Sequence, residues 1–217
     1  MSGQHWRMTV YDLTAGEPSV LPARSHAFVY AARGTAELGA ATRADVAAAA
    51  RIAEGEGAFA AVGDRVETTG TAWLFEIAPA SLPLRREPGL SPVLSRIAVI
   101  DDGPHILRAD RVEAAAGAVT PAHRHRGPGI RRLERGLLEA EVGDAVDRIA
   151  AGAAWFETGH ETVVGTNISG GANRFVRVML LPAERAGGLS SFVAASPAEA
   201  AKPRAVALTL FGEQPVG

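Results

Sequence analysis

Short apolar runs, most of them bounded by Gly, Pro or Asn, dominate the pattern of hydrophobic and polar positions along this chain. The clearest are residues 72–78 (AWLFEIA), 174–181 (RFVRVMLL) and 205–211 (AVALTLF). Runs of this length, apolar throughout or alternating, are typical of strands in antiparallel sheets. Glycines at positions 34, 39, 55, 57, 63 and 70 recur at the short intervals that turns between such strands require. The pattern predicts an all-β protein built as a barrel or sandwich.

Three stretches depart from this pattern. Residues 41–52 (ATRADVAAAARI) are rich in alanine and favour a helix by propensity, so at most one short helix is expected there. Residues 80–105 contain four prolines and predict a connection followed by the first strands of a second unit. The tail after Pro182 reads as loop through residues 196–203 and ends in one more strand.

An internal repeat divides the chain into two halves. Residues 51–60 match residues 148–157 at an offset of 97, which pairs Gly55 with Gly152. Upstream, residues 28–38 match residues 130–140 at an offset of 102. Downstream, residues 72–79 match residues 174–182, and both segments end on proline. Three matches in the same order predict two related units, which we place at residues 1–85 and 86–217.

Composition and charge exclude several classes of function. The chain carries 22 Lys and Arg against 24 Asp and Glu, a net charge of -2, so there is no basic field for nucleic acid. It has no cysteine, so any metal must be held by His, Asp, Glu or water. No apolar run approaches the ~18 residues of a membrane span, and the N-terminus lacks the apolar segment of a signal peptide. We therefore expect a cytoplasmic protein with neither nucleic acid nor membrane as a partner.

Two histidines, His123 and His125, stand two residues apart near the start of a β-rich segment. On a strand this spacing points both imidazoles to the same face, where they can share a metal ion. The pair alone is a weak signal, so its surroundings decide how it is interpreted.

Those surroundings resemble a cupin. Gly117, His123, His125 and Gly136 fall in the register of the first cupin motif, although its Glu position is taken by Gly129. The second motif has its counterpart in residues 152–167 (GAAWFETGHETVVGTN), where Thr162 falls at the His position and His160 stands nearby. The resemblance implies double-stranded β-helix (jelly-roll) barrels, arranged as two tandem cupin units.

The resemblance also implies a divalent metal ion, of iron, manganese, zinc or nickel. His123 and His125 would be two of its ligands. His160 is the first candidate for a third ligand, because it shares strand parity with Thr162 and a small register shift would bring it inward. Glu157 is the second, and would complete a two-His, one-carboxylate face.

Arg131 and Trp155 are the candidate substrate-binding residues. Alternation from Gly129 puts Arg131 on the same face, where its guanidinium could clamp a carboxylate. The other interpretation is that Arg131 and Arg132 both reach solvent near the barrel mouth. Trp155 is expected in the pocket wall.

The first unit has none of the candidate metal ligands of the second unit. Applying the repeat offsets puts Leu21 and Ala23 at the positions of His123 and His125, and Ala60 and Gly63 at those of Glu157 and His160. We therefore expect a degenerate cupin unit with a structural role.

Two functions remain open. The first is a metal-dependent enzyme, dioxygenase-like or isomerase-like, acting on a small carboxylate-bearing or aromatic molecule. The alternative is a non-catalytic cupin that binds or senses a small molecule and has lost the full metal set. Exposed strand edges make a homodimer the expected assembly.

Overall fold

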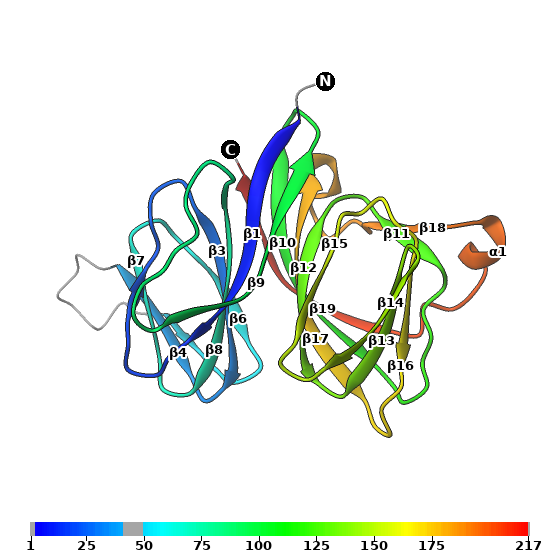
Figure 1. Cartoon of the computed structure of the whole chain (residues 1–217), viewed down its shortest axis with the longest axis horizontal. Helices are drawn as coiled ribbons and strands as arrows, with labels where there is room; N and C mark the ends of the chain where they lie inside the picture. Colours follow the sequence, from blue (N-terminus) through cyan, green and yellow to red (C-terminus); the bar gives the residue numbers. More distant parts are fainter. Residues whose placement is uncertain (1–2, 41–49, 217) are drawn as a thin grey trace. The chain divides into compact units, whose positions relative to one another are not determined.

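The computed structural model describes residues 3–40 and 50–216, and almost all of its regular elements are β-strands (Figure 1). The chain divides into two compact units, Gln4–Ala98 and Val99–Gly217, the latter together with the first three residues. The division falls inside a strand, β9 (Leu90–Ile100), later in the chain than the boundary expected after residue 85.

The N-terminal unit is built from two antiparallel sheets. Their strand orders are β6-β3-β8-β1-β9 and β2-β7-β4-β5. The strands are β1 (Gln4–Leu13), β2 (Ser19–Val20), β3 (His26–Arg33), β4 (Ala36–Ala40), β5 (Ala50–Ile52), β6 (Gly57–Ala60), β7 (Asp64–Thr68), β8 (Thr71–Pro79) and β9.

The C-terminal unit repeats this plan with the orders β15-β12-β17-β10-β19 and β14-β13-β16-β11-β18. Its strands are β10 (His105–Ala114), β11 (His123–His125), β12 (Gly129–Arg135), β13 (Leu137–Val142), β14 (Ala145–Ala150), β15 (Ala154–Glu157), β16 (Val163–Asn167), β17 (Asn173–Pro182), β18 (Phe192–Ala194) and β19 (Ala207–Val216). The predicted strands at residues 72–78 and 174–181 are therefore β8 and β17, and the last predicted strand is β19.

Strand pairing confirms the internal repeat. Ala27 of β3 pairs with Ala60 of β6, and Gly129 of β12 pairs with Glu157 of β15. These four positions differ by 102 and 97 residues, the same offsets that relate the two halves of the sequence. Both units also have a register irregularity at the equivalent place, after Ala31 and after Leu133. The repeat in the sequence is therefore a repeat of jelly-roll architecture.

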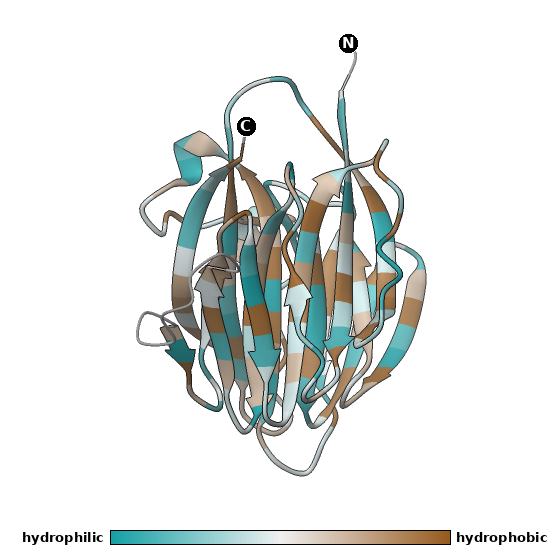
Figure 2. Cartoon of the chain, turned by 90° about the vertical axis from the view of Figure 1, so that its left-hand side faces the viewer, coloured by the Kyte–Doolittle hydropathy of each residue, from teal (hydrophilic) through white to brown (hydrophobic). Residues whose placement is uncertain are grey.

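The interiors of the two units differ in chemistry. Hydrophobic and hydrophilic residues alternate along many strands (Figure 2). In the N-terminal unit most inward positions form one large apolar cluster, which includes Leu21 and Ala60, although Glu76 is also buried and pairs with Arg85 at 2.7 Å. In the C-terminal unit the inward positions include the charged side chains Arg131, Glu157 and Arg177, all buried. A structural role for the N-terminal unit stays a prediction.

Short elements interrupt the segment between β17 and β19. A 3-10 turn (Ala183–Arg185), β18 and one helical turn, α1 (Pro197–Ala200), all lie where the sequence pattern predicts loop. The helix allowed at residues 41–52 falls mostly outside the described residues, and residues 50–52 are the strand β5. In the part of the chain that the structure describes, no helix has the length and apolarity needed to span a membrane. The homodimer and the cytoplasmic location stay predictions.

Candidate functional site

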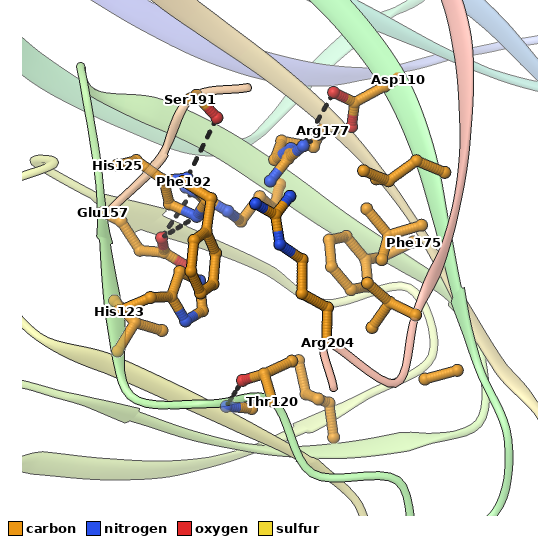
Figure 3. Close-up of a pocket in the computed structure, with 18 of the residues that line it drawn as sticks. Asp110, Thr120, His123, His125, Glu157, Phe175, Arg177, Ser191, Phe192 and Arg204 are labelled. Atoms are coloured by element: carbon orange, nitrogen blue, oxygen red, sulfur yellow. Dashed lines mark hydrogen bonds and ion pairs between the residues drawn. The ribbon is translucent and has the colours of Figure 1, made fainter. Parts of the chain in front are cut away.

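A cavity of about 280 Å³ lies inside the C-terminal barrel (Figure 3). Both sheets contribute to its wall. β11 supplies His123 and His125, β12 supplies Arg131, and β15 supplies Trp155 and Glu157. These five residues were all predicted from the sequence, and they line one cavity because each lies at an inward position of its strand.

The two histidines have fixed orientations. The Nδ1–H of His123 donates to the backbone carbonyl of Pro121 at 2.7 Å, and Nδ1 of His125 lies 3.2 Å from Oγ of Ser191. The rings pack edge to face, with centroids 4.9 Å apart. Because a carbonyl can only accept, the neutral form of His123 has its lone pair on Nε2.

Both imidazoles are neutral at physiological pH. Burial lowers the pKa of His123, and the hydrogen bond to Pro121 only partly offsets this effect. Burial lowers the pKa of His125 much further, and the guanidinium groups of Arg177 and Arg131 add to the effect. The histidines therefore contribute no positive charge to the cavity.

Arg131 forms a buried ion pair with Glu157. Its side chain turns back along β12, so that Nη1 donates to the carbonyl of Gly129 at 2.8 Å and Nη2 lies 2.5 Å from Oε2 of Glu157. The other oxygen of Glu157 accepts from the indole N–H of Trp155 at 3.0 Å. Burial lowers the pKa of Arg131 to about 10 although Glu157 opposes this, so the guanidinium is still charged at neutral pH.

A second buried pair lies directly beside the first. Arg177 on β17 is the cross-strand neighbour of Arg131, and on its other side it pairs with Asp110 of β10. Its Nε and Nη2 donate to the two carboxylate oxygens at 2.9 and 2.8 Å. Two adjacent arginines would destabilise the sheet if unpaired, and each therefore has its own carboxylate.

The segment that follows β17 contributes an aromatic ring and a cation to the cavity. Phe192 of β18 stacks on His123, with ring centroids 4.6 Å apart and planes inclined by 16°. The guanidinium of Arg204 lies 4.3 Å from the centroid of Phe192 and donates to Oγ of Ser190. Arg204 forms no ion pair with a carboxylate among the described residues. Figure 3 shows its side chain extending into the cavity from the chain beyond α1.

His160 is the predicted residue that the structure does not bring to this cavity. It is exposed in the loop between β15 and β16, and it lines a second hollow to which His125 also contributes. Thr162 is exposed as well, whereas the next residue, Val163, is buried, lines the cavity and pairs with His123. The inward position opposite His123 is therefore apolar, because β16 begins one residue later than the motif comparison implies.

The sequence pattern did not predict several of the residues that line the cavity. Asp110 and Arg177 had a signal, since each is a charged residue on the inward face of a strand that is otherwise buried on both faces. Phe192 and Arg204 had none, because they lie in a segment that reads as loop. Only the tertiary structure places them at the cavity.

The donor set does not fit a resident divalent metal. Glu157 already uses both oxygens, one on Arg131 and one on Trp155. Among the residues that the structure describes, no three His, Asp or Glu side chains form a group arranged to hold a metal ion. His123 and His125 offer two nitrogens, and a structural or catalytic metal site needs at least three protein ligands in the usual case.

The buried histidines predict a loss of stability in mild acid. Above a pH of about 7.5 the imidazoles are almost entirely neutral in both states and contribute little to the pH dependence. As the pH falls below 6.5, the unfolded chain takes up protons that the folded chain, with its lowered pKa values, does not. The free energy of unfolding should therefore fall, by up to about 1.4 kcal/mol for each histidine and each pH unit.

Denaturant unfolding at a series of pH values checks this prediction. The variant His123→Gln/His125→Gln should show a shallower decline between about pH 6.5 and 5.5 than the natural chain. Replacing His5, which is exposed, should leave the slope close to that of the natural chain. A decline that is equally steep in the double variant would contradict the prediction.

Comparison with known proteins supports the fold and goes no further. No family model and no curated protein sequence matches this chain. Among solved structures it is similar to the oxalate decarboxylase of Lactobacillus farciminis in its formate complex, with a TM-score of 0.61 and 12% identity over 93% of this chain and 82% of that one. It is also similar to the oxalate decarboxylase OxdC of Bacillus subtilis, described with Mn(II) centres, with a TM-score of 0.57 and 11% identity over 93% and 74%.

A third similar structure is a putative glyoxylate-induced protein of Pseudomonas aeruginosa, with a TM-score of 0.55 and 12% identity over 81% of this chain and 74% of that one. At such identities the similarity establishes the fold alone. The chain therefore has the two-unit jelly-roll fold that its sequence predicts.

Proposed function

We propose that the C-terminal barrel binds a small organic anion, a monocarboxylate with an apolar or aromatic body, and that the chain serves as a binding or sensing protein. The observation that carries this proposal is the charge inventory of the cavity. Of its charged lining residues, Arg131 and Arg177 are matched by Glu157 and Asp110. Arg108 is matched by Glu213.

Arg204 is the remaining cation that lines the cavity. It lines the cavity from a solvent-exposed position and has no carboxylate partner among the described residues, while both histidines are neutral. An anion entering the cavity would therefore meet one uncompensated positive charge. The same charge disfavours a divalent cation.

The remaining wall of the cavity suits an apolar ligand body. Trp155 and Phe175 contact each other edge to face, with centroids 5.1 Å apart, and Phe192 stacks on His123. Leu138 and Val163 complete this apolar lining from the facing sheet. A pocket with mostly apolar walls and a few charged groups is the usual form of a small-molecule site.

Calorimetric titration with a short series of aromatic carboxylates tests the proposal. Benzoate, phenylacetate and phenylpropionate are each compared with the corresponding amide, which has the same shape and no charge. At least one carboxylate should bind, and its amide should bind more weakly. Replacing Arg204 by glutamine should weaken carboxylate binding by about 10- to 100-fold, the value of a charge-assisted hydrogen bond.

Arg148→Gln is the matched control for this experiment. It removes the same charge from an exposed position on β14, where Arg148 pairs with Glu139 at 3.5 Å. Carboxylate binding should be unchanged in this variant. Binding of amides as tight as that of the acids, or no effect of Arg204→Gln, would refute the proposal.

The competing function is a metal-dependent enzyme. In its favour, Nδ1 of His123 donates to a carbonyl, which leaves the lone pair of its Nε2 available to a metal ion. Metal analysis of protein purified without an affinity tag separates the two functions. One ion per chain that disappears in the His123→Ala/His125→Ala variant would favour the enzyme, and metal-free protein would favour the anion-binding function.

A further inference from the structure

Gly129 opens the space that the guanidinium of Arg131 fills. On the inward face of the sheet, Gly129 lies between Glu157 of β15 and Met179 of β17, its two cross-strand neighbours. A Cβ atom at this position would lie 2.7 Å from Cγ of Met179 and 3.2 Å from Nη1 of Arg131. Any larger residue would therefore crowd the guanidinium, and the glycine permits Arg131 to fold back over its own strand.

The guanidinium of Arg131 binds the carboxylate of Glu157, which a metal ion at this site would need as a ligand. Oε2 of Glu157 lies 3.6 Å from Nε2 of His125, a separation that two ligands of one ion at about 2.0–2.2 Å each would have. The same oxygen lies 2.5 Å from Nη2 of Arg131. An ion held by His125 and Glu157 would therefore compete with the guanidinium for one oxygen atom.

Because Arg131 and Glu157 are both buried, the competition for the carboxylate favours the guanidinium over a metal ion. The side chain of Arg131 is among the largest that are fully buried, with 1% of its surface exposed, and Glu157 is 4% exposed. To admit an ion, the protein would have to leave a guanidinium without its carboxylate in an environment of low dielectric constant, next to a second guanidinium on Arg177. A divalent ion would add two further positive charges within a few ångströms.

We propose that the guanidinium of Arg131 takes the place of a divalent metal ion beside His123, His125 and Glu157. The barrel then holds a latent metal site, which the side chain of Arg131 keeps closed. Neutralising position 131 should release the carboxylate of Glu157. The carboxylate of Glu157 and the imidazole of His125 already lie 3.6 Å apart, and a shift of the His123 side chain would complete a two-His, one-carboxylate set, which suits first-row transition metals. The proposal goes beyond anion binding and does not depend on it.

Titration with Co(II), followed by its visible absorption, tests the proposal. The natural chain should show no cobalt spectrum that depends on His123. Arg131→Met should bind one Co(II) per chain at least about 100-fold more tightly than the natural chain. Arg131→Lys is the matched control, because it keeps a positive charge at the same position, and it should gain no site. Adding His123→Ala to Arg131→Met should abolish the new spectrum.

Two results would overturn the proposal. One is a Co(II) spectrum in the natural chain that is lost on His123→Ala, and the other is a folded Arg131→Met protein that binds no Co(II). Circular dichroism establishes folding, and Arg131→Gln serves as a second neutral variant that can still donate to the carbonyl of Gly129. If neither variant folds, the titration of the natural chain decides alone, because His123-dependent binding refutes the proposal and its absence supports it. Carboxylate titration of the natural chain reports separately on the anion-binding function.

Discussion

Replacing Glu157 with glutamine is expected to lower the free energy of unfolding of the C-terminal unit by about 3–5 kcal/mol. The change keeps the shape of the side chain and removes its charge. Arg131, whose pKa of about 10 keeps it charged at neutral pH, would then lie buried without a counter-ion. Removing one partner of a buried pair costs far more than the pair itself contributes, because the desolvated charge that remains has nothing to offset it.

Urea unfolding followed by the fluorescence of Trp155 measures this effect in the C-terminal unit, in a chain that carries Trp6→Phe and Trp73→Phe. Adding Arg131→Met to Glu157→Gln should restore most of the lost stability, since the unpaired charge is then removed. Glu139→Gln breaks an exposed ion pair with Arg148 and should cost less than about 1 kcal/mol. Equal costs for Glu157→Gln and Glu139→Gln would argue against a buried, charged Arg131.

Replacing Asp110 with asparagine is expected to have an effect of similar size, about 3–5 kcal/mol. Asp110 accepts two hydrogen bonds from Arg177, at 2.9 and 2.8 Å, and both residues are buried. Without this carboxylate, the charge of Arg177 would lie beside that of Arg131 on the next strand with only Glu157 to balance both. The repulsion between the two guanidinium groups would add to the cost of desolvation.

The same unfolding measurement checks the second prediction. Asp147 on β14 is exposed, so Asp147→Asn is a matched control that should change stability by less than about 0.5 kcal/mol. The double variant Asp110→Asn/Arg177→Met should be more stable than Asp110→Asn alone. If the double variant is instead the less stable of the two, the unpaired guanidinium is not the source of the loss.

Taken together, the two pairs explain how a barrel interior tolerates four charged side chains. Each guanidinium is bound to a carboxylate on a neighbouring strand, and the four charges sum to zero. The interior of the N-terminal unit is mostly apolar and holds one such pair, Glu76 with Arg85. Two adjacent buried pairs that line a cavity distinguish the C-terminal barrel, which is why it is the candidate site.

Much of the architecture could be predicted from the sequence because it depends on local rules. Alternation along a strand determines which residues share a face, so His123 and His125 face the cavity together, as do Trp155 and Glu157. Repeated segments pack in repeated ways, so the offsets of 102 and 97 residues reappear in the pairing of Gly129 with Glu157. The two jelly-roll units and the location of the cavity follow from these rules.

The identity of the third partner at the site could not be predicted in this way. A shift of one residue turns every side chain of a strand to the opposite face of the sheet. Because β16 starts at Val163, His160 and Thr162 do not face the cavity. Neither alternation nor spacing reveals where a loop places a strand's first residue. That position depends on the turn between β15 and β16.

By itself, the sequence determined the strands, the two related units and the face on which the histidines lie, because backbone geometry imposes a period of two on every strand. Only the tertiary structure decided that Arg131 reaches Glu157, that Arg177 reaches Asp110, and that Arg204 enters the cavity. Long charged side chains have many rotamers, and neighbouring strands and loops from distant parts of the chain select one of them. Those choices place two paired guanidinium groups beside the predicted histidines.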